Sequence, residues 1–238
     1  MDSPELGGPA LIRALDELGH VNRYLGGHRC SIRILGQLIR KRGQDRFPSH
    51  RPLRILDVGA GGGDASAAMV SWAERELIPL RVIAVDFNRQ ACGYAAERTA
   101  SSRSVSVVQA DAFLQPFKDE SFDYVHCSLF LHHFGTTEAA RLLTTLFALS
   151  RSGLIVNDLH RHPIAYWATK IGSSVMSRSY MVRHDGPISV QRGFTRADLV
   201  NLAAASGFRW TLLQWRWAFR YLAVACKSPN SPAPQAAR

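Results

Sequence analysis

The stretch RILDVGAGGGDASAAM (residues 54–69) decides the fold, because it places four glycines in the five residues 59–63 directly after a short apolar run. Glycine at this density allows the backbone to turn sharply and lets a bound molecule lie against the main chain. A strand, a glycine-rich turn and a helix in this order form the place where open α/β folds hold a nucleotide. The segment therefore predicts a ligand site at this turn.

Short β-rich runs alternate with longer helical runs from Arg54 onward, which predicts a parallel sheet with right-handed crossovers. Strands are expected at 54–58, 81–86, 105–109, 122–128 and 153–158, and helices at 64–78, 88–100 and 136–150. Two closing strands, 208–217 and 219–227, are separated by a short connection and predict a hairpin at one sheet edge. The expected fold is α/β, a doubly wound, mostly parallel seven-stranded sheet that binds ligands at the carboxyl ends of its strands.

The segments outside this alternation divide the chain. Apolar residues at helical spacing predict helices at Ala10–Tyr24 and 30–42, within an N-terminal helical segment 1–50. The domain proper is expected at 51–228, and the mixed Arg- and Ser-rich stretch 161–193 interrupts it as an insertion. A further helix starts at Thr195, with Asp198 completing a capping box. The last residues, 229–238, have the composition of a disordered tail.

The composition excludes several classes of protein. The N-terminus has no secretory pattern, and no apolar run approaches the roughly 20 residues of a membrane span, so a cytoplasmic protein is expected. The four cysteines stand far apart, which favours neither a zinc site nor a disulfide framework. The net charge of +10 belongs to the flanks, since residues 161–220 carry 9 Lys and Arg against 2 Asp and Glu, while 55–160 carry 8 against 12. Basic flanks attract phosphates, carboxylates or an anionic membrane surface.

The glycine turn itself discriminates between cofactors. A dinucleotide fingerprint would require a third glycine where Asp64 stands, and an acidic residue beside a pyrophosphate is unfavourable. No Gly-Lys-Ser/Thr follows the glycines, as a P-loop would require. The remaining pattern, D-x-G-x-G-x-G at 57–63, suits a ligand with an amino group and a sulfonium. Here the chain resembles the class I S-adenosylmethionine (SAM)-dependent methyltransferases, and the resemblance continues through most of its length.

The resemblance implies a set of cofactor contacts. An acidic residue after the second strand of the family binds both ribose hydroxyls, and "RVIAVDFN" offers Asp86 there, with Phe87 beside the adenine. In "QADAF", Asp111 and Ala112 match the residues that meet the adenine amino group. The full implied set is Asp57, Gly59, Ala60, Gly61, Gly63, Asp86, Phe87, Asp111, Ala112 and Leu129. Singly, Asp86 could instead cap the next helix and Asp111 could close a turn.

Histidines near strand ends are the candidate general bases, because a phenolic hydroxyl has a pKa near 10 and needs help to lose its proton at pH 7. The candidates are His132, His133, His160, His162 and His184. His133 and His160 rank first, since both follow strand ends that face the expected site. Asp158 could orient an imidazole. No metal is expected, because clustered carboxylates are not found at the motif positions.

Other motifs point to the acceptor. The stretch 117–134 resembles the fourth-strand motif of the ubiquinone and menaquinone methyltransferases. "NRYLGG" (22–27), "NDLHRHP" (157–163) and "RHDGPISVQRGF" (183–194) resemble a bacterial group of small-molecule methyltransferases associated with polyketide or phenolic-lipid biosynthesis. That resemblance implies methyl transfer to a phenolic or polyketide hydroxyl under a cap built from 1–50 and 161–193. Arg183, Arg192 and His184 are then expected acceptor contacts.

Alternative functions stay open at this stage. They are C-methylation of a quinone-like ring, RNA methylation, or SAM binding without catalysis. RNA is disfavoured because the N/D-P-P-Y/F motif of amino-group methylation is missing after the fourth strand. A NAD(P)-dependent reductase is disfavoured by Asp64. Peripheral membrane contact and a homodimer are both compatible with the sequence.

Overall fold

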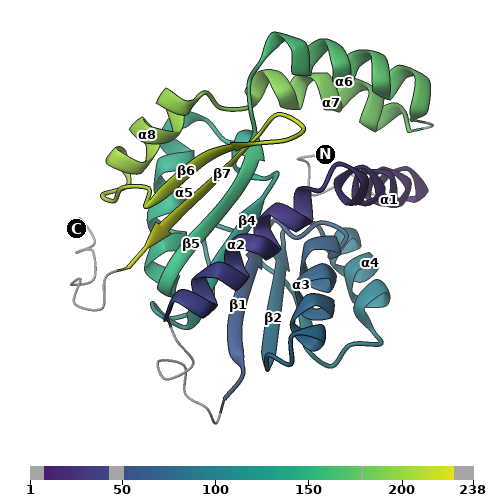
Figure 1. Cartoon of the computed structure of the whole chain (residues 1–238). Coiled ribbons are helices and arrows are strands. Elements are labelled where there is room, and N and C mark those ends of the chain that lie inside the picture. Colours follow the sequence, from purple (N-terminus) through teal and green to yellow (C-terminus); the bar gives the residue numbers. More distant parts are fainter. Residues whose placement is uncertain (1–7, 43–50, 178, 228–238) are drawn as a thin grey trace.

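A computed structural model of the chain describes residues 8–42, 51–177 and 179–227. Seven strands form one sheet in the order β3-β2-β1-β4-β5-β7-β6 (Figure 1). The strands are β1 (Leu53–Val58), β2 (Leu80–Asp86), β3 (Val105–Gln109), β4 (Phe122–Ser128), β5 (Ser150–Leu159), β6 (Leu212–Arg216) and β7 (Arg220–Cys226). Strands β1 to β5 pair in parallel, and β7 runs antiparallel to both β5 and β6. The predicted fold class, including the terminal hairpin, is confirmed.

Helices cover both faces of the sheet (Figure 1). The helices are α1 (Pro9–Tyr24), α2 (Gly27–Arg42), α3 (Asp64–Arg75), α4 (Arg89–Thr99), α5 (Thr136–Leu149), α6 (Pro163–Met176), α7 (Tyr180–Arg192) and α8 (Arg196–Ala205), with a 3-10 turn, η2, at Leu131–His133. Helices α2 and α3 pack on one face, and α5 and α8 pack on the other. The carboxyl ends of β1 to β5 therefore open toward one edge, where the predicted site residues stand.

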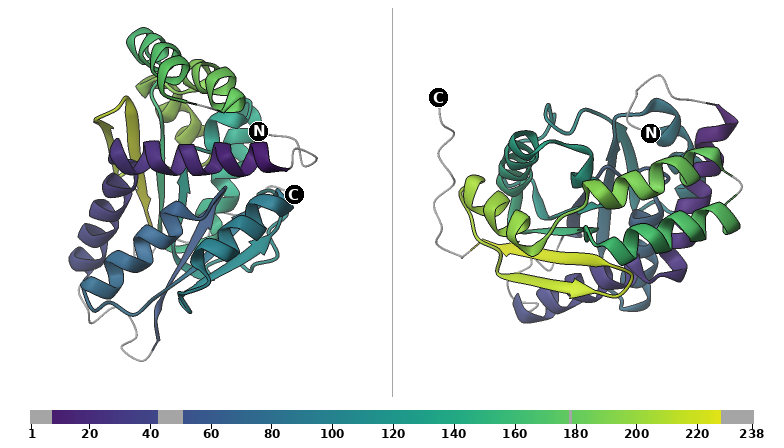
Figure 2. Two further views of the ribbon diagram at one scale, coloured as in Figure 1. Left: turned by 90° about the vertical axis from the view of Figure 1, so that its right-hand side faces the viewer. Right: turned by 90° about the horizontal axis from the view of Figure 1, so that it is seen from above.

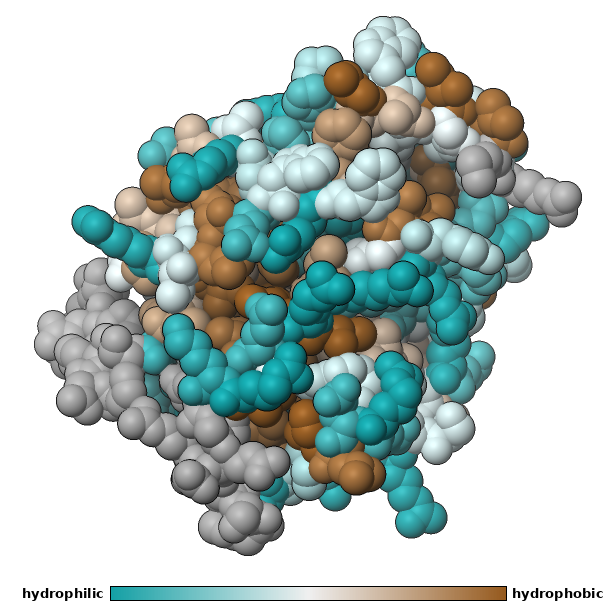
Figure 3. Space-filling view, in the orientation of Figure 1, coloured by the Kyte–Doolittle hydropathy of each residue, from teal (hydrophilic) through white to brown (hydrophobic). Residues whose placement is uncertain are grey.

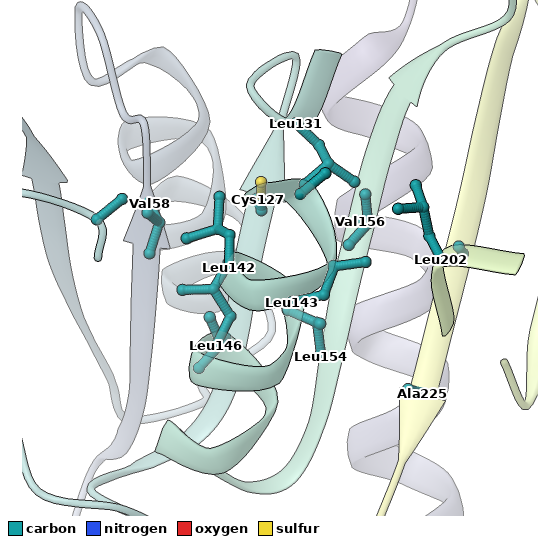
Figure 4. Packing of buried hydrophobic residues seen from close by; sticks show 14 of the residues in the cluster. Val58, Cys127, Leu131, Leu142, Leu143, Leu146, Leu154, Val156, Leu202 and Ala225 are labelled. Atoms are coloured by element: carbon teal, nitrogen blue, oxygen red, sulfur yellow. The ribbon is translucent and has the colours of Figure 1, made fainter. Parts of the chain in front are cut away.

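Each face has its own apolar core. On the α5 side, Leu142, Leu143 and Leu146 are fully buried against Leu154 and Val156 of β5 (Figure 4). These positions of α5 recur at helical spacing, so one stripe of the helix meets the alternating inward residues of the strands. On the other face, residues of α2 and α3 pack on β1 and β2. The two cores fix the strand ends at the ligand edge.

Helix α1 and the insertion lie above this edge (Figure 2). Leu11 and Leu15 of α1 are buried beside Ala91 and Tyr94 of α4, and Met181 of α7 packs on the same cluster. Helix α1 thus bridges the cofactor side of the sheet and the insertion. Where the domain and cap begin and end stays a prediction, and the predicted disordered tail at 229–238 lies outside the described residues.

Several elements differ from the sequence prediction: β5 begins at Ser150 and not at 153, and α3 ends at Arg75 and not at 78. Helix α2 begins at Gly27 rather than residue 30, because a left-handed Gly26 (φ +72°) alone makes the break. Residues 208–211 are not part of β6, since Phe208 stacks on Phe147 (4.7 Å between ring centroids) and the Trp210 indole donates to the Leu199 carbonyl oxygen (2.7 Å). The insertion, for which no structure was predicted, forms α6 and α7. No helix in the described part of the chain is both long and apolar enough to cross a membrane.

Candidate active site

The glycine-rich turn forms a cradle between β1 and α3. Gly59, Gly61 and Gly63 have φ values of +68°, +52° and +75°, where other residues are strained. A methyl group on Gly59 would overlap the Phe130 ring, so no side chain fits there. Leu15 of α1 approaches Gly61 from above, 3.4 Å from where a Cβ would stand. The turn therefore requires glycine at position 59, because the chain's own Phe130 fills the space beside the backbone.

Asp86 stands at the carboxyl end of β2 and is tied to the glycine turn. One carboxylate oxygen accepts the Gly61 N–H (2.8 Å) and the other accepts the Asn88 N–H (2.9 Å). Asn88, not Asp86, caps α4 by accepting two backbone N–H groups with its side chain. The capping alternative for Asp86 is therefore wrong. Phe87 beside it is 51% exposed.

The neighbouring strand ends bring the other predicted residues to the same edge. Gln109, at the end of β3, donates its side-chain N–H to the Phe87 carbonyl oxygen (3.2 Å). Asp111 accepts the Phe113 N–H (2.8 Å), so it does close a turn, while Ala112 is buried. Leu129 follows β4 with a φ of +51°. Contacts of these residues with a cofactor stay predictions.

Asp57 lies beneath the turn instead of on its surface. Its side chain is 2% exposed, and its two oxygens accept hydrogen bonds from Ser66 of α3 (2.6 Å) and His126 of β4 (2.7 Å). The other His126 nitrogen meets the Ser31 hydroxyl of α2 (2.9 Å). Asp57 thus joins the start of α3, the sheet and α2 below the glycines.

A buried carboxylate and imidazole stand across the edge, at the ends of β5 and β4. Asp158 is 1% exposed and lies 2.7 Å from Nδ1 of His132, which is 4% exposed. The Asp158 carboxylate also accepts the N–H groups of Phe130 (3.2 Å), Leu131 (2.8 Å) and Leu159 (2.7 Å). Burial alone would raise the pKa of Asp158, but the His132 imidazole and these N–H groups outweigh it and hold the pKa below its usual value. Asp158 is therefore an ionised partner that fixes the ring of His132.

A cavity of about 460 Å³ opens beside this pair. It is lined by His132, His133, Phe134, Gly135, Thr136, Arg161, Arg192, Gly193, Phe194, Asp198, Asn201 and Leu202. His132 is the residue of the Asp158–His132 pair that lines the cavity, and Asp158 holds its Nδ1. Arg161 at its rim is paired with Asp198 (2.7 Å).

Comparison with known proteins bears on this geometry. Residues 55–153 match a protein family described as a methyltransferase domain. A demethylmenaquinone methyltransferase of Thermobifida fusca is 28% identical over 176 residues, which are 68% of this chain and 70% of the relative. One from Staphylococcus aureus is 36% identical over 90 residues, about a third of each chain (36% and 34%). Together these similarities support a class I SAM-dependent methyltransferase.

Solved structures agree with the fold of this methyltransferase. Magnesium protoporphyrin IX methyltransferase of Synechocystis PCC 6803, with bound S-adenosylhomocysteine, has a TM-score of 0.59 at 18% identity and covers 87% of each chain. The DszA carbon methyltransferase has a TM-score of 0.66 at 14% identity, covering 90% of this chain and 57% of its own.

SAM is the cofactor, and the site fits it. The Asp86 carboxylate, held by the Gly61 N–H, and the half-exposed ring of Phe87 stand side by side in sequence at the glycine turn, which offers a polar acceptor and an apolar ring to a nucleoside. Asp64 places a carboxylate in the first turn of α3, which disfavours the pyrophosphate of a dinucleotide at this turn. In the described residues no three His, Cys, Asp or Glu side chains are arranged to hold a metal ion.

The predicted catalytic and acceptor residues of the methyltransferase divide into two groups. His133 and Arg192 line the cavity, and the His133 ring lies 4.3 Å from that of His132. His184 and Arg183 do not line it. His184 is paired with Asp185 (3.0 Å) on the exposed side of α7, and Arg183 donates to the Ser177 carbonyl oxygen (2.8 Å).

His160 also stands apart from the cavity. Its ring packs against Tyr221 (4.8 Å between centroids) and His162 (5.3 Å), and its buried Nδ1 has no hydrogen-bond partner in the structure. Burial, and then the neighbouring His162, lower its pKa. Asp158 does orient an imidazole, as expected, but that imidazole belongs to His132, which ranked behind His133 and His160.

Proposed function

We propose that this methyltransferase moves the methyl group of SAM to a hydroxyl of a hydrophobic phenolic or polyketide-type small molecule. The observation that carries the proposal is the buried Asp158–His132 pair, because His132 also lines a cavity beside the ends of β4 and β5. A methyl acceptor with an acidic hydroxyl needs such a base. An acceptor that is already nucleophilic, such as a neutral amine, does not.

The proposed cofactor contacts follow the strand ends. Asp86 binds the ribose hydroxyls with the acceptor capacity that its two backbone hydrogen bonds leave. Phe87 covers the adenine with its exposed ring face, and Asp111 with Ala112 meets the adenine amino group. Gly59, Ala60, Gly61, Gly63 and Leu129 would hold the methionine part. Asp57 supports this turn from below through Ser66 and His126.

The chain then prepares the acceptor for transfer. SAM, when bound, supplies an electrophilic methyl group on its sulfonium. With the Asp158 carboxylate at Nδ1, the proton of neutral His132 stays on Nδ1 and the lone pair stays on Nε2. Nε2 takes the hydroxyl proton as the acceptor oxygen attacks, and Asp158 stabilises the imidazolium that forms. The products are the methyl ether and S-adenosylhomocysteine.

The lining of the cavity supports an aromatic acceptor of partly anionic character. Phe134, Phe194 and Leu202 offer apolar contact, and Arg192 offers a positive charge at the end of α7. Apolar walls with a few placed polar groups are typical of small-molecule sites. Arg192 would favour the phenolate over the phenol as the proton leaves. Contact of Arg183 and His184 with the acceptor is not supported by their position on the outer side of α7.

The similarity to demethylmenaquinone methyltransferases favours a second candidate, methylation at a ring carbon of a quinol. A quinol, like a phenol, becomes nucleophilic at carbon when its hydroxyl is deprotonated. The same base would therefore serve both reactions, and the position of the acceptor over the methyl group would decide between oxygen and carbon.

Methyl-labelled SAM tests the proposal. The protein is incubated with labelled SAM and a panel of phenols, naphthalenediols and total bacterial lipid extract, and the mixture is separated into organic, RNA and protein fractions. Label in the organic fraction, with a one-methyl mass gain, supports the proposal, and NMR of the product separates an O-methyl from a C-methyl group. Label in RNA, or no transfer by a protein that binds SAM, would contradict it. Loss of the organic label in His132→Ala ties transfer to the named base.

A further inference from the structure

Helix α6 presents its large apolar residues to solvent. Ile164, Trp167, Ile171 and Val175 are 62%, 56%, 62% and 80% exposed. At 100° per residue these positions fall within one narrow face along the whole helix. Figure 3 shows hydrophobic residues gathered at the upper end of the molecule, where Figure 1 places α6. We call these four residues the α6 stripe.

The opposite face of α6 packs on α7 with small residues. Ala165 is 4% exposed, and a methyl group on Gly186 of α7 would stand 3.2 Å from Thr169. The usual amphipathic arrangement is therefore inverted, because the large apolar side chains face outward while small ones make the intramolecular contact. Such a contiguous exposed patch marks a surface that docks on something.

The charge around the α6 stripe selects the partner. Lys170 lies 5.0 Å from the Trp167 ring and 5.7 Å from the Tyr166 ring. Among the described residues of α6 and α7, Lys170, Arg183 and Arg192 are cationic, and the acidic Asp185 is paired with His184. A helix with Trp and Ile on one face and lysine at its flank is typical of segments that lie in the surface of an anionic bilayer.

A second segment extends this surface. The turn between β6 and β7 carries Trp217, which is 74% exposed, and its Phe219 stacks on His162 (5.2 Å), directly before α6. Indole rings are favoured at the boundary between lipid headgroups and acyl chains. The turn and the first residues of α6 thus form one rim at the carboxyl edge of the sheet.

We infer that the α6 stripe docks on the surface of a bilayer that contains anionic phospholipid. The insertion that docks also borders the cavity, since Arg161 and Arg192 flank α6 and α7 and both line it. A hydrophobic acceptor dissolved in the bilayer would then enter the cavity without crossing water. This use of the surface rests on the proposed acceptor, whereas the docking itself is measured without one.

The test is vesicle sedimentation of the full chain with phosphatidylcholine vesicles and with vesicles that also contain phosphatidylglycerol. The wild type is expected to partition onto the anionic vesicles, less strongly at high salt. Ile171→Ser/Val175→Ser should lower the partition coefficient at least tenfold, and Lys170→Glu about fivefold. The matched control is Leu77→Ser/Val200→Ser, which removes two exposed apolar side chains from the turn after α3 and from α8 and should leave binding within twofold.

Two outcomes overturn the inference. The first is a wild type that stays in solution with every vesicle. Light scattering then shows whether the α6 stripe instead joins two copies of the chain, in a dimer that Ile171→Ser/Val175→Ser dissociates, and the inference is overturned in either case. Equal loss in the matched control would also overturn it, since binding would then be unspecific. SAM affinity, measured on each variant by calorimetry, is expected to stay at the wild-type value and shows that the variants are folded. Methyl transfer to a water-soluble phenol should likewise be unchanged, so a failed docking test and a failed proposed function give different results.

Discussion

Replacing Asp158 by Asn should remove the base while leaving the shape of the site. The carboxylate accepts hydrogen bonds from His132 and from three backbone N–H groups, of Phe130, Leu131 and Leu159. An amide oxygen can keep the first two N–H groups, but its NH₂ group then faces Leu159 N–H and His132. The imidazole must turn its lone pair to Nδ1, so its proton moves to Nε2 and the base is lost.

These contacts set the size of the loss in rate and of the loss in stability. A general base contributes about 10²–10⁴-fold, so kcat at saturating SAM should fall by that factor. One charge-assisted hydrogen bond is lost and one buried N–H loses its acceptor, which together cost about 3 kcal/mol of the free energy of unfolding. The assay is the initial rate of label transfer from SAM to a phenol, with SAM affinity from calorimetry and stability from urea unfolding.

Matched variants separate catalysis from structure. Asp185→Asn changes an exposed Asp–His pair on α7 and should alter the rate less than twofold. His132→Ala should lose as much rate as Asp158→Asn, and the double variant should lose little more, because the two residues act as one unit. A folded Asp158→Asn enzyme with more than a third of the wild-type rate would refute the reasoning.

Further predictions concern the cofactor edge and stability. Asp86→Ala should weaken SAM binding by about 1.5–3 kcal/mol, measured by calorimetry. The control Asp119→Ala removes an exposed carboxylate and should not change the SAM affinity. Equal SAM affinity in the two variants would remove Asp86 from the site. Gly59→Ala should lower the free energy of unfolding, measured in urea, by at least about 2 kcal/mol, because the added methyl group meets Phe130 at a left-handed backbone position. The control Gly93→Ala on α4, where the added methyl group has no neighbour within 4 Å, should raise it slightly. Similar values for the two variants would contradict the close packing at Gly59. His28 is half-buried and its pKa is lowered to about 4, by burial first and then by His126. It therefore binds fewer protons in the folded state, and the free energy of unfolding should fall by about 1–3 kcal/mol between pH 6.5 and 4. His28→Gln should flatten that slope in unfolding curves recorded across this range, and an unchanged slope would exclude His28 as its cause.

Sequence reasoning located the elements whose pattern is local. The strand at 105–109 and the strand at 122–128 have the bounds that the β-rich runs predict. The capping box at Thr195 is also confirmed, since its hydroxyl accepts the Asp198 N–H (3.2 Å) and its own N–H meets the Asp198 carboxylate (2.8 Å). Each of these features depends on residues only a few positions apart.

Features set by tertiary contacts were not predictable in the same way. His132 and His133 are adjacent, and only the fold shows that His132 turns inward to Asp158, 26 residues later, because η2 buries Leu131 beside it. The motif implies that Asp57 contacts the cofactor, and nothing in it indicates that His126 and Ser66 occupy its oxygens. The helices of the insertion are not predicted, because Pro187 interrupts the pattern of α7, whereas the apolar residues of α6 do recur at helical spacing and only the structure shows that they face outward.

The most direct test of the account compares acceptors of different acidity. Methyl transfer is measured for the wild type and His132→Ala at saturating SAM, with a phenol that is protonated at the assay pH and with one of similar shape that is already ionised. If His132 removes the acceptor proton, its loss should cost about 10²-fold or more with the protonated phenol and only a few-fold with the ionised one. The same loss with both acceptors, or none with either, would contradict the assignment of His132 as the general base.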